Sequence, residues 1–436
     1  MYTHIMDWVL ILLFCLALYI LISGYIKTHN LFPSHIQFYG PILGLKTDNV
    51  AFFDWFRRYS RGLRIYGTIG VVMVIIVSIL MVTLIILSVN LTVAIKPEPT
   101  AINKPQNLFL IPGLNEFVPS TVAVWFAFFF TLLVHEFGHA ILCRVEKIKV
   151  KSMGILLLVI PIGAFVEPDE EEVNKSGSWQ RMRMYGAGIM NNLVIGVLCF
   201  ALMVTMIGWA VPSEEPIVVG LYKDYPAAAA DIPFPSIIRS INDTPVRTST
   251  EVSALLNTTQ PGDHVILGLE SEGGNLSRHT LNLSAWPEDL GLRPSGFMGV
   301  FYYNGPAVIQ TVQKMFSPSG FLILLSLPFI PGIEGQQLRI LGFEIADIGY
   351  YTAPFPYYWQ VIHLLFWSGF INLAAGLFNA LPMLPLDGGL IFREGTERLL
   401  ARRGLERFSS RIVGAITSLM LVMMVALLTL PYLFHL

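Results

Sequence analysis

Long apolar segments are the feature that most limits what this chain can fold into. A helix that crosses the ~30 Å hydrocarbon core of a bilayer needs about 20 predominantly apolar residues. The chain has six such segments: 8–26, 65–91, 121–142, 186–211, 359–381 and 411–434. It is 54% hydrophobic and 13% charged, whereas soluble domains are about 25% charged. The sequence therefore predicts a polytopic α-helical membrane protein with about six transmembrane helices.

The first apolar segment is expected to stay in the membrane rather than be removed as a signal peptide. Residues 1–7 carry no Lys or Arg, and 8–26 is long enough to span. The cysteines Cys15, Cys143 and Cys199 lie in or beside apolar segments, so we interpret them as core thiols and not as a disulfide framework. The net charge of −2 gives no indication of a nucleic-acid partner.

The distribution of Lys and Arg predicts the orientation. These residues concentrate in three loops, within 27–64, 144–183 and 393–411. The positive-inside rule assigns such loops to the cytoplasm, which places both termini outside when six helices span. The apolar run 320–330 lies between two prolines and is too short to span, so we expect it to be re-entrant or interfacial.

Two regions depart from the transmembrane pattern. Residues 212–285 are rich in Pro, Asn, Ser and Thr and contain alternating runs such as 264–270, which predict a β-rich insert on the extracytoplasmic side. Residues 153–166 are apolar but interrupted by Gly154, Pro161 and Gly163. A strand pair that dips into the membrane fits this stretch better than a spanning helix, provided that it lines a protein cavity.

The third apolar segment contains the sequence His135-Glu136-Phe137-Gly138-His139. Residues four apart lie on one face of a helix, so both imidazoles are able to bind one metal ion, and Glu136 is close enough to act on a bound water. Ionisable residues are costly inside a membrane span and are rarely kept without a function. The motif therefore predicts a zinc site in the membrane.

A catalytic zinc usually has three protein ligands and one open position. Asp387, in the sequence Pro382-Met-Leu-Pro-Leu-Asp-Gly-Gly389, is the candidate for the third ligand. The two prolines interrupt the helix there, and Gly388 and Gly389 permit close backbone approach. Taken alone, this Asp is equally well explained as part of an ordinary cytoplasmic turn.

Together these motifs resemble the site-2 protease family of intramembrane zinc metalloproteases, peptidase family M50. The similarity rests on His135 to His139, on the segment 163–168, and on Asn379 followed by the Pro-x-x-Pro-Leu-Asp-Gly-Gly sequence. The Tyr39-Gly-Pro41 loop is similar to archaeal-type members. In place of the family's Ala-Gly-Pro-x-x-Asn motif, the chain has Ala187-Gly-Ile-Met-Asn-Asn192.

The resemblance implies a role for each matched residue. His135, His139 and Asp387 bind one Zn²⁺, Glu136 is the general base and acid, and Asn379 holds the substrate or the oxyanion. Asn192 is implied in substrate binding. Gly163, Ala164 and Phe165 belong to the family's membrane-embedded β-loop, which pairs with the substrate. The resemblance also implies a cell-membrane location and a substrate that is a single-pass transmembrane protein in the lipid bilayer, already cleaved by another protease.

The insert resembles a PDZ domain, in the runs 226–232 and 237–246. It is expected either to bind a ligand or to act as a size filter. The implied domains are two N-terminal helices and a loop (1–118), the first part of the catalytic core (119–211), the PDZ-like insert (212–286), a linker (287–357) and the second part of the core (358–436).

Two other functions use the same residues. A metal or solute transporter could carry its cargo on His135, Glu136 and His139, although no internal repeat of the kind common in transporters is evident. A catalytically inactive membrane scaffold is the second alternative, and the intact motifs argue against it.

Overall fold

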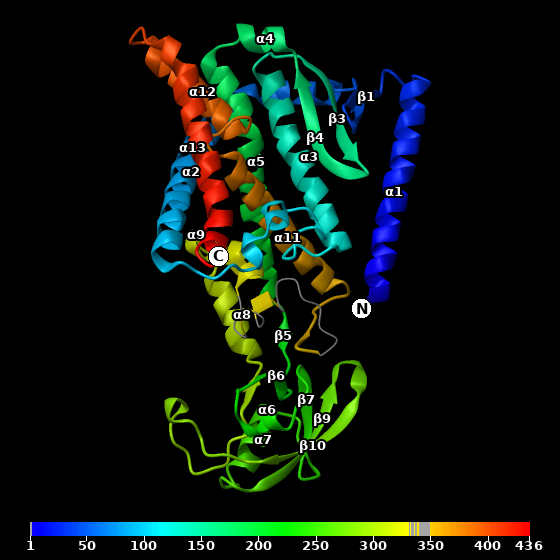
Figure 1. Ribbon diagram of the computed structural model, residues 1–436, viewed down its shortest axis with the longest axis vertical. Helices are drawn as coiled ribbons and strands as arrows, with labels where there is room; N and C mark the ends of the chain where they lie inside the picture. The colour runs from blue at the N-terminus through cyan, green and yellow to red at the C-terminus, as the bar shows by residue number, and fades with distance from the viewer. Residues whose placement is uncertain (1, 331, 333–334, 336–337, 340–348) are drawn as a thin grey trace. The chain divides into compact units, whose positions relative to one another are not determined.

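The computed structural model describes residues 2–330, 332, 335, 338–339 and 349–436. By its internal contacts the chain divides into two compact units, residues 1–196 with 371–436, and residues 197–370. All the residues predicted to form the active site belong to the first unit, which is shown with the rest of the chain in Figure 1.

Long helices make up most of the chain. Apolar composition accounts for most of them, and two of their ends have recognisable caps. Thr121 caps the helix that carries the His-Glu-Phe-Gly-His motif, its side chain accepting from the backbone N–H of Val124. The longest helix ends at Lys96, which adopts the left-handed conformation. The long helices are α1 (Tyr2–Thr28), α2 (Ser60–Ile95), α3 (Val122–Val145), α5 (Ser178–Ile207), α11 (Tyr358–Asn379), α12 (Asp387–Ala401) and α13 (Ser409–Leu433).

Five helical segments are long and apolar enough to cross a membrane, counted over the described side chains, which begin at Phe14. They correspond to five of the six predicted spans: Ala51–Ile95, Val122–Val145, Ser178–Ile207, Tyr358–Asn379 and Glu406–Leu433. The remaining predicted span, 8–26, falls in α1, which has 27 residues. The predicted short segment is also present, as α9 (Pro318–Ser326) and the 3-10 turn Leu327–Phe329. A multi-pass membrane protein is thus supported, and the count of six spans stays a prediction.

Helix α12 was not expected from the sequence, which indicated a basic loop over 393–411. The chain leaves α11 at Asn379, turns through Pro382 and Pro385, and begins a new helix at Asp387. Its buried residues are Gly388, Gly389, Ile391 and Glu394. Its charged residues, among them Arg393, Glu397 and Arg398, made this segment resemble a loop in the sequence.

The predicted strand pair near residue 160 is present in the first unit. It consists of β3 (Val150–Leu158) and β4 (Ile160–Pro168), which pair antiparallel. With β1 (Ile36–Tyr39) and β2 (Ile42–Thr47) they form a four-stranded sheet in the order β1-β2-β3-β4. The β3–β4 hairpin lies alongside α3 in Figure 1. Strand β4 is at one edge of this sheet, and its outer side has no partner strand among the described residues.

The second unit contains a sheet with the order β10-β9-β7-β6-β11. It encloses an apolar core that includes Val218, Ile238 and Leu267. The predicted strand at 264–270 is β9, but the sheet also includes β11, beyond the predicted boundary at 286. Three residues are too few to show alternation, which explains the omission. The strands of the second unit are β5 (Val211–Pro212), β6 (Ile217–Leu221), β7 (Ser236–Ile241), β8 (Thr244–Pro245), β9 (His264–Ser271), β10 (Leu276–Asn282), β11 (Val300–Tyr302) and β12 (Tyr351–Thr352), of which β5 and β12 pair with each other outside this sheet.

The remaining helices are short. In the first unit, α4 (Glu170–Lys175) follows the β3–β4 hairpin and is capped by the carboxylate of Asp169. The second unit has α6 (Pro226–Ala229), α7 (Ser249–Leu256) and α8 (Gly305–Lys314), besides α9.

Candidate metal centre

Helix α3 brings its two histidines together as the spacing predicts. His135 and His139 lie on one face, with ring centroids 4.8 Å apart. Their Nε2 atoms face each other at 3.1 Å. Both rings are largely enclosed, with side-chain exposures of 12% and 15%.

Asp387 completes this group from a different helix. As the first residue of α12, it places its carboxylate Oδ2 3.0 Å from His135 Nε2 and 3.2 Å from His139 Nε2. The turn before it is tight. A Cβ on Gly388 would lie 2.3 Å from the Ala380 carbonyl oxygen, and one on Gly389 would lie 2.4 Å from the Met383 carbonyl. The predicted close backbone approach at these glycines is therefore confirmed.

Helix α5 fixes the far side of both imidazoles. Nδ1 of His139 donates to the backbone carbonyl of Met184 at 2.8 Å. Nδ1 of His135 lies 3.2 Å from the side-chain amide nitrogen of Asn192. Rotating that amide by 180° presents its oxygen as the acceptor, and this oxygen otherwise has no hydrogen-bond partner among the described residues. Both Nδ1 atoms then carry the proton, so both Nε2 lone pairs face the centre.

The three donor atoms fit a zinc ion. Their separations of 3.0, 3.1 and 3.2 Å are close to the spacing of about 3.3–3.4 Å between ligands of a tetrahedral zinc with bonds of about 2.0–2.1 Å. Oδ2 of Asp387 is buried and accepts no hydrogen bond from the described residues. Three inward lone pairs, one of them on a carboxylate, repel one another unless a cation lies between them. Three protein ligands leave a fourth position open.

Glu136 lies beside this triangle rather than in it. The side chains of Glu136, His139 and Asp387 line one cavity of about 280 Å³. The Glu136 carboxylate is also close to the backbone N–H of Val166 in β4. Distance alone permits a second ligand set, since donor atoms of His135, Glu136 and His139 lie within 4.8 Å of one another. The shorter distances to Asp387 favour Asp387 as the third ligand.

Gly188 is the second residue of the Ala187-Gly-Ile-Met-Asn-Asn192 segment. In the structure it lies directly against the two imidazoles. A Cβ there would be 2.6 Å from His139 Nε2 and 2.8 Å from His135 Nε2. No side chain fits, because Cβ atoms do not approach other atoms so closely. The Ala187-Gly188 pair in the fourth apolar segment was the available signal, but only the fold shows what it faces.

The predicted β-loop residues are all in β4, at different distances from the centre. Phe165 lines the cavity together with Val166 and Pro168. Gly163 and Ala164 pair with Leu156 and Ile155 of β3 and are not among the cavity residues. The edge strand therefore forms part of the wall of the cavity that Glu136 also lines.

Asn379 is the last residue of α11 and is partly buried. No hydrogen bond joins its side chain to His135, His139 or Asp387 among the described residues. The structure thus brings together the three predicted ligands and Glu136, places Asn192 behind His135, and leaves Asn379 without a contact to the donors.

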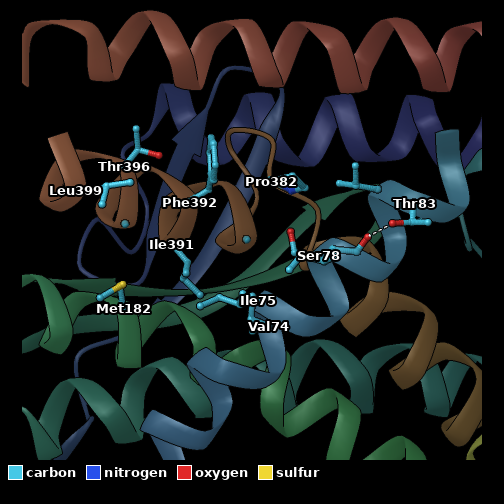
Figure 2. A pocket seen from close by; sticks show the side chains of 14 residues that line it. Val74, Ile75, Ser78, Thr83, Met182, Pro382, Ile391, Phe392, Thr396 and Leu399 are labelled. Carbon is cyan, nitrogen blue, oxygen red and sulfur yellow. Dashed lines mark hydrogen bonds between the residues drawn. The ribbon is translucent and has the colours of Figure 1, made fainter. Parts of the chain in front are cut away.

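A second and larger cavity lies next to the site but holds none of its donors. It has a volume of about 490 Å³ and runs between α2 and α12, with apolar walls from Ile75, Ile391 and Phe392 (Figure 2). Met182 and Pro382 also line it, and Gly388, the neighbour of Asp387, forms part of its wall. We assign the chemistry to the smaller cavity because the titratable groups converge there.

Replacing Asn192 by Ala is expected to weaken zinc binding about 10- to 100-fold, because groups that orient a ligating histidine typically contribute that much. Competition against a chromophoric chelator measures the affinity. Asn192→Asp retains an acceptor oxygen and should bind zinc more tightly than the Ala variant. Equal affinity of Asn192→Ala and the wild type would show that the amide does not orient His135.

Comparison with known proteins agrees with this geometry. The profile of peptidase family M50 matches residues 123–427, well over half of the 436-residue chain. The chain belongs to peptidase family M50. It is accordingly a multi-pass membrane protease of the site-2 type with zinc as its cofactor.

Individual relatives are distant. An uncharacterized protein of Methanocaldococcus jannaschii is 23% identical over 80% of this chain and 76% of its own length. Zinc metalloprotease RasP of Bacillus licheniformis is 24% identical over 60% of this chain and 61% of its own. A membrane-bound transcription factor site-2 protease homolog of Arabidopsis thaliana is 27% identical over 37% of this chain and 31% of its own.

Solved structures were also matched, among them one PDZ domain. The PDZ domain of an SdrC-like protein from Listeria monocytogenes is 19% identical, over 21% of this chain and 90% of that domain. The TM-score of 0.18 assigns no fold to the insert.

Proposed function

We propose that this M50 protease is an intramembrane endopeptidase that hydrolyses peptide bonds within transmembrane segments of its substrates. The observation that carries the proposal is the position of the donor triangle. His135 and His139 lie within α3, a candidate membrane span, and the base candidate Glu136 shares their cavity. A peptide bond cut at such a site must itself lie at membrane depth.

The contacts support one role for each of these residues. His135, His139 and Asp387 hold the metal. When bound, zinc supplies a Lewis acid that polarises a carbonyl and lowers the pKa of a water molecule toward ~7. Glu136 accepts a proton from the attacking water and returns it to the leaving amine. Asn192 positions His135 rather than the substrate, because its amide faces the ring edge opposite Nε2.

Asn379 is proposed to donate its amide N–H to the developing oxyanion. Its side chain is not occupied by a hydrogen bond to the donor atoms, which leaves it available for a substrate. Asn379 is the last residue of α11, and Asp387 follows eight residues later as the first residue of α12. The two residues therefore flank the same interhelical turn.

Substrate binding is assigned to the outer edge of β4. A helical segment offers no free backbone groups to a protease, so it must unwind before it is cut. The unpaired edge of β4 supplies N–H and C=O groups for an added strand. Phe165 and Val166 lie on the same strand beside Glu136, so a substrate paired there is held close to the base.

The remaining assignments concern the whole chain. The insert is placed outside the cytoplasm, as the distribution of Lys and Arg indicates. The substrate is a single-pass membrane protein whose external part has first been removed by another protease. The insert, PDZ-like in its sequence, either binds the new chain end or excludes larger ectodomains.

Metal removal tests the proposal. Purified protein in lipid vesicles, with a single transmembrane segment as substrate, should lose cleavage on treatment with a zinc chelator. Stoichiometric zinc should restore it, with the cut inside the apolar segment by mass spectrometry. Cleavage confined to soluble loops would contradict the intramembrane assignment. Transmembrane flux of zinc without cleavage would favour a transporter, and zinc binding without either activity would favour a scaffold.

A further inference from the structure

A buried glutamate follows a metal ligand by seven residues on both ligand helices. Glu394 follows Asp387 within α12, and Glu146 follows His139 as the C-cap residue at the end of α3. Seven residues are about two helical turns, so each glutamate lies near the face of its ligand, about 10 Å along the axis. The Glu146 side chain is 1% exposed and that of Glu394 is 4% exposed. Carboxylates are seldom so deeply buried unless they are paired.

The partners of both glutamates are arginines of one helix, α5. Arg183 Nε donates to Glu146 Oε1 at 2.7 Å. Arg181 binds Glu394 through two parallel hydrogen bonds, Nε to Oε1 at 2.7 Å and Nη2 to Oε2 at 2.8 Å. Residues two apart on a helix point about 200° from each other. Helix α5 therefore extends one arginine toward α3 and the other toward α12.

We propose that these four residues, Arg181, Arg183, Glu146 and Glu394, form a bracket that sets the distance between α3 and α12 and so places Asp387 against the two histidines. We call them the α5 bracket. The inference rests on the proposed metal site and adds four positioning residues to it. None of the four contacts the donor atoms, so they act through the helices that bear the ligands.

Further contacts around the α5 bracket support its positioning role. Arg64 of α2 lies 3.6 Å from Glu146 and donates to the Val145 carbonyl at 3.2 Å. Arg181 also donates to the Ser176 carbonyl at the end of α4. Helix α5 itself contributes the Met184 carbonyl and Asn192 to the histidines. One helix thus controls the orientation of both imidazoles and the position of the carboxylate.

Buried ion pairs of this kind fix the relative position of two helices more than they stabilise the fold. Desolvation of two buried charges offsets much of their attraction, and apolar pairs of similar size are often as stable. A bidentate Arg–carboxylate pair nevertheless has one favoured geometry. It therefore fixes the relative position of two helices in a way that apolar contacts, which tolerate sliding, do not.

The test is zinc affinity in the full chain, measured by chelator competition in detergent. Glu394→Gln should weaken zinc binding about 10- to 100-fold, the range typical of groups that support metal ligands. Glu406→Gln, at an exposed glutamate in the 3-10 turn after the same helix, is the control and should bind zinc like the wild type. Arg181→Met should show the loss seen in Glu394→Gln, and the double variant should lose no more than either single variant, because they break one pair.

Two further measurements keep the result interpretable. Circular dichroism of the zinc-free variants verifies folding, and Glu146→Gln tests the α3 side if Glu394→Gln does not fold. Unchanged zinc affinity in folded Glu394→Gln, or fully additive losses in the double variant, would overturn the bracket. Zinc retained by Asp387→Asn would instead overturn the metal site itself, so the two failures are distinguishable.

Discussion

Glu136→Gln is expected to retain zinc and to lose about 10²- to 10⁴-fold in kcat, the usual contribution of a general base. The carboxamide has the shape of the carboxylate but cannot accept the proton of the attacking water. Zinc should remain, because the three close donor atoms belong to His135, His139 and Asp387. Zinc content by atomic absorption and single-turnover cleavage of a transmembrane substrate measure the two quantities.

Asp387→Asn is the matched variant for this experiment. It also replaces a carboxylate by an amide, but at a proposed ligand, so zinc should be lost together with activity. The opposite pattern, in which Glu136→Gln loses zinc and Asp387→Asn keeps it, would assign Glu136 to the metal, as the 4.8 Å cluster permits. The pair therefore decides between the two ligand sets that the distances allow.

Gly188→Ala is expected to abolish most activity, because the added methyl group has no room beside the two imidazoles. The added Cβ would lie 2.6 Å from His139 Nε2 and 2.8 Å from His135 Nε2. Neither ring is free to retreat, because the Met184 carbonyl and Asn192 hold their far edges. We expect zinc affinity to fall by about 10- to 100-fold and cleavage by about 10²-fold or more, since displacement of about 1 Å has that cost.

Gly186→Ala supplies the control for this substitution. It lies on the same helix two residues earlier, and the nearest atoms to its added Cβ are 3.4 and 3.5 Å away, in Val71 and Gly70 of α2. Both substitutions favour the helix intrinsically by roughly 1 kcal/mol, so helix stability does not distinguish them. If Gly188→Ala binds zinc as tightly as Gly186→Ala, the steric argument is wrong.

Much of the first unit is encoded locally. The spacing of His135 and His139 on an apolar helix, the punctuation of 153–166, and the Pro-Leu-Asp-Gly-Gly turn each have a short-range physical reason. They predicted α3, the β3–β4 hairpin and the close turn before Asp387, all of which the structure contains. Helix α12 was missed because its sequence is rich in charged residues. Strand β11 was missed because it is too short to show an alternating pattern.

Local patterns in the sequence are enough to identify the candidate zinc ligands and to place His135 and His139 on one helix, because periodicity and capping act over a few residues. The meeting of Asp387 with both histidines, at 3.0 and 3.2 Å, depends on the tertiary structure. The tertiary structure also decided that Gly188 and Asn192 lie against the imidazoles and that two arginines of α5 reach two different helices. These contacts join residues far apart in the chain. Their geometry depends on how the helices pack, and a local sequence pattern does not predict that packing.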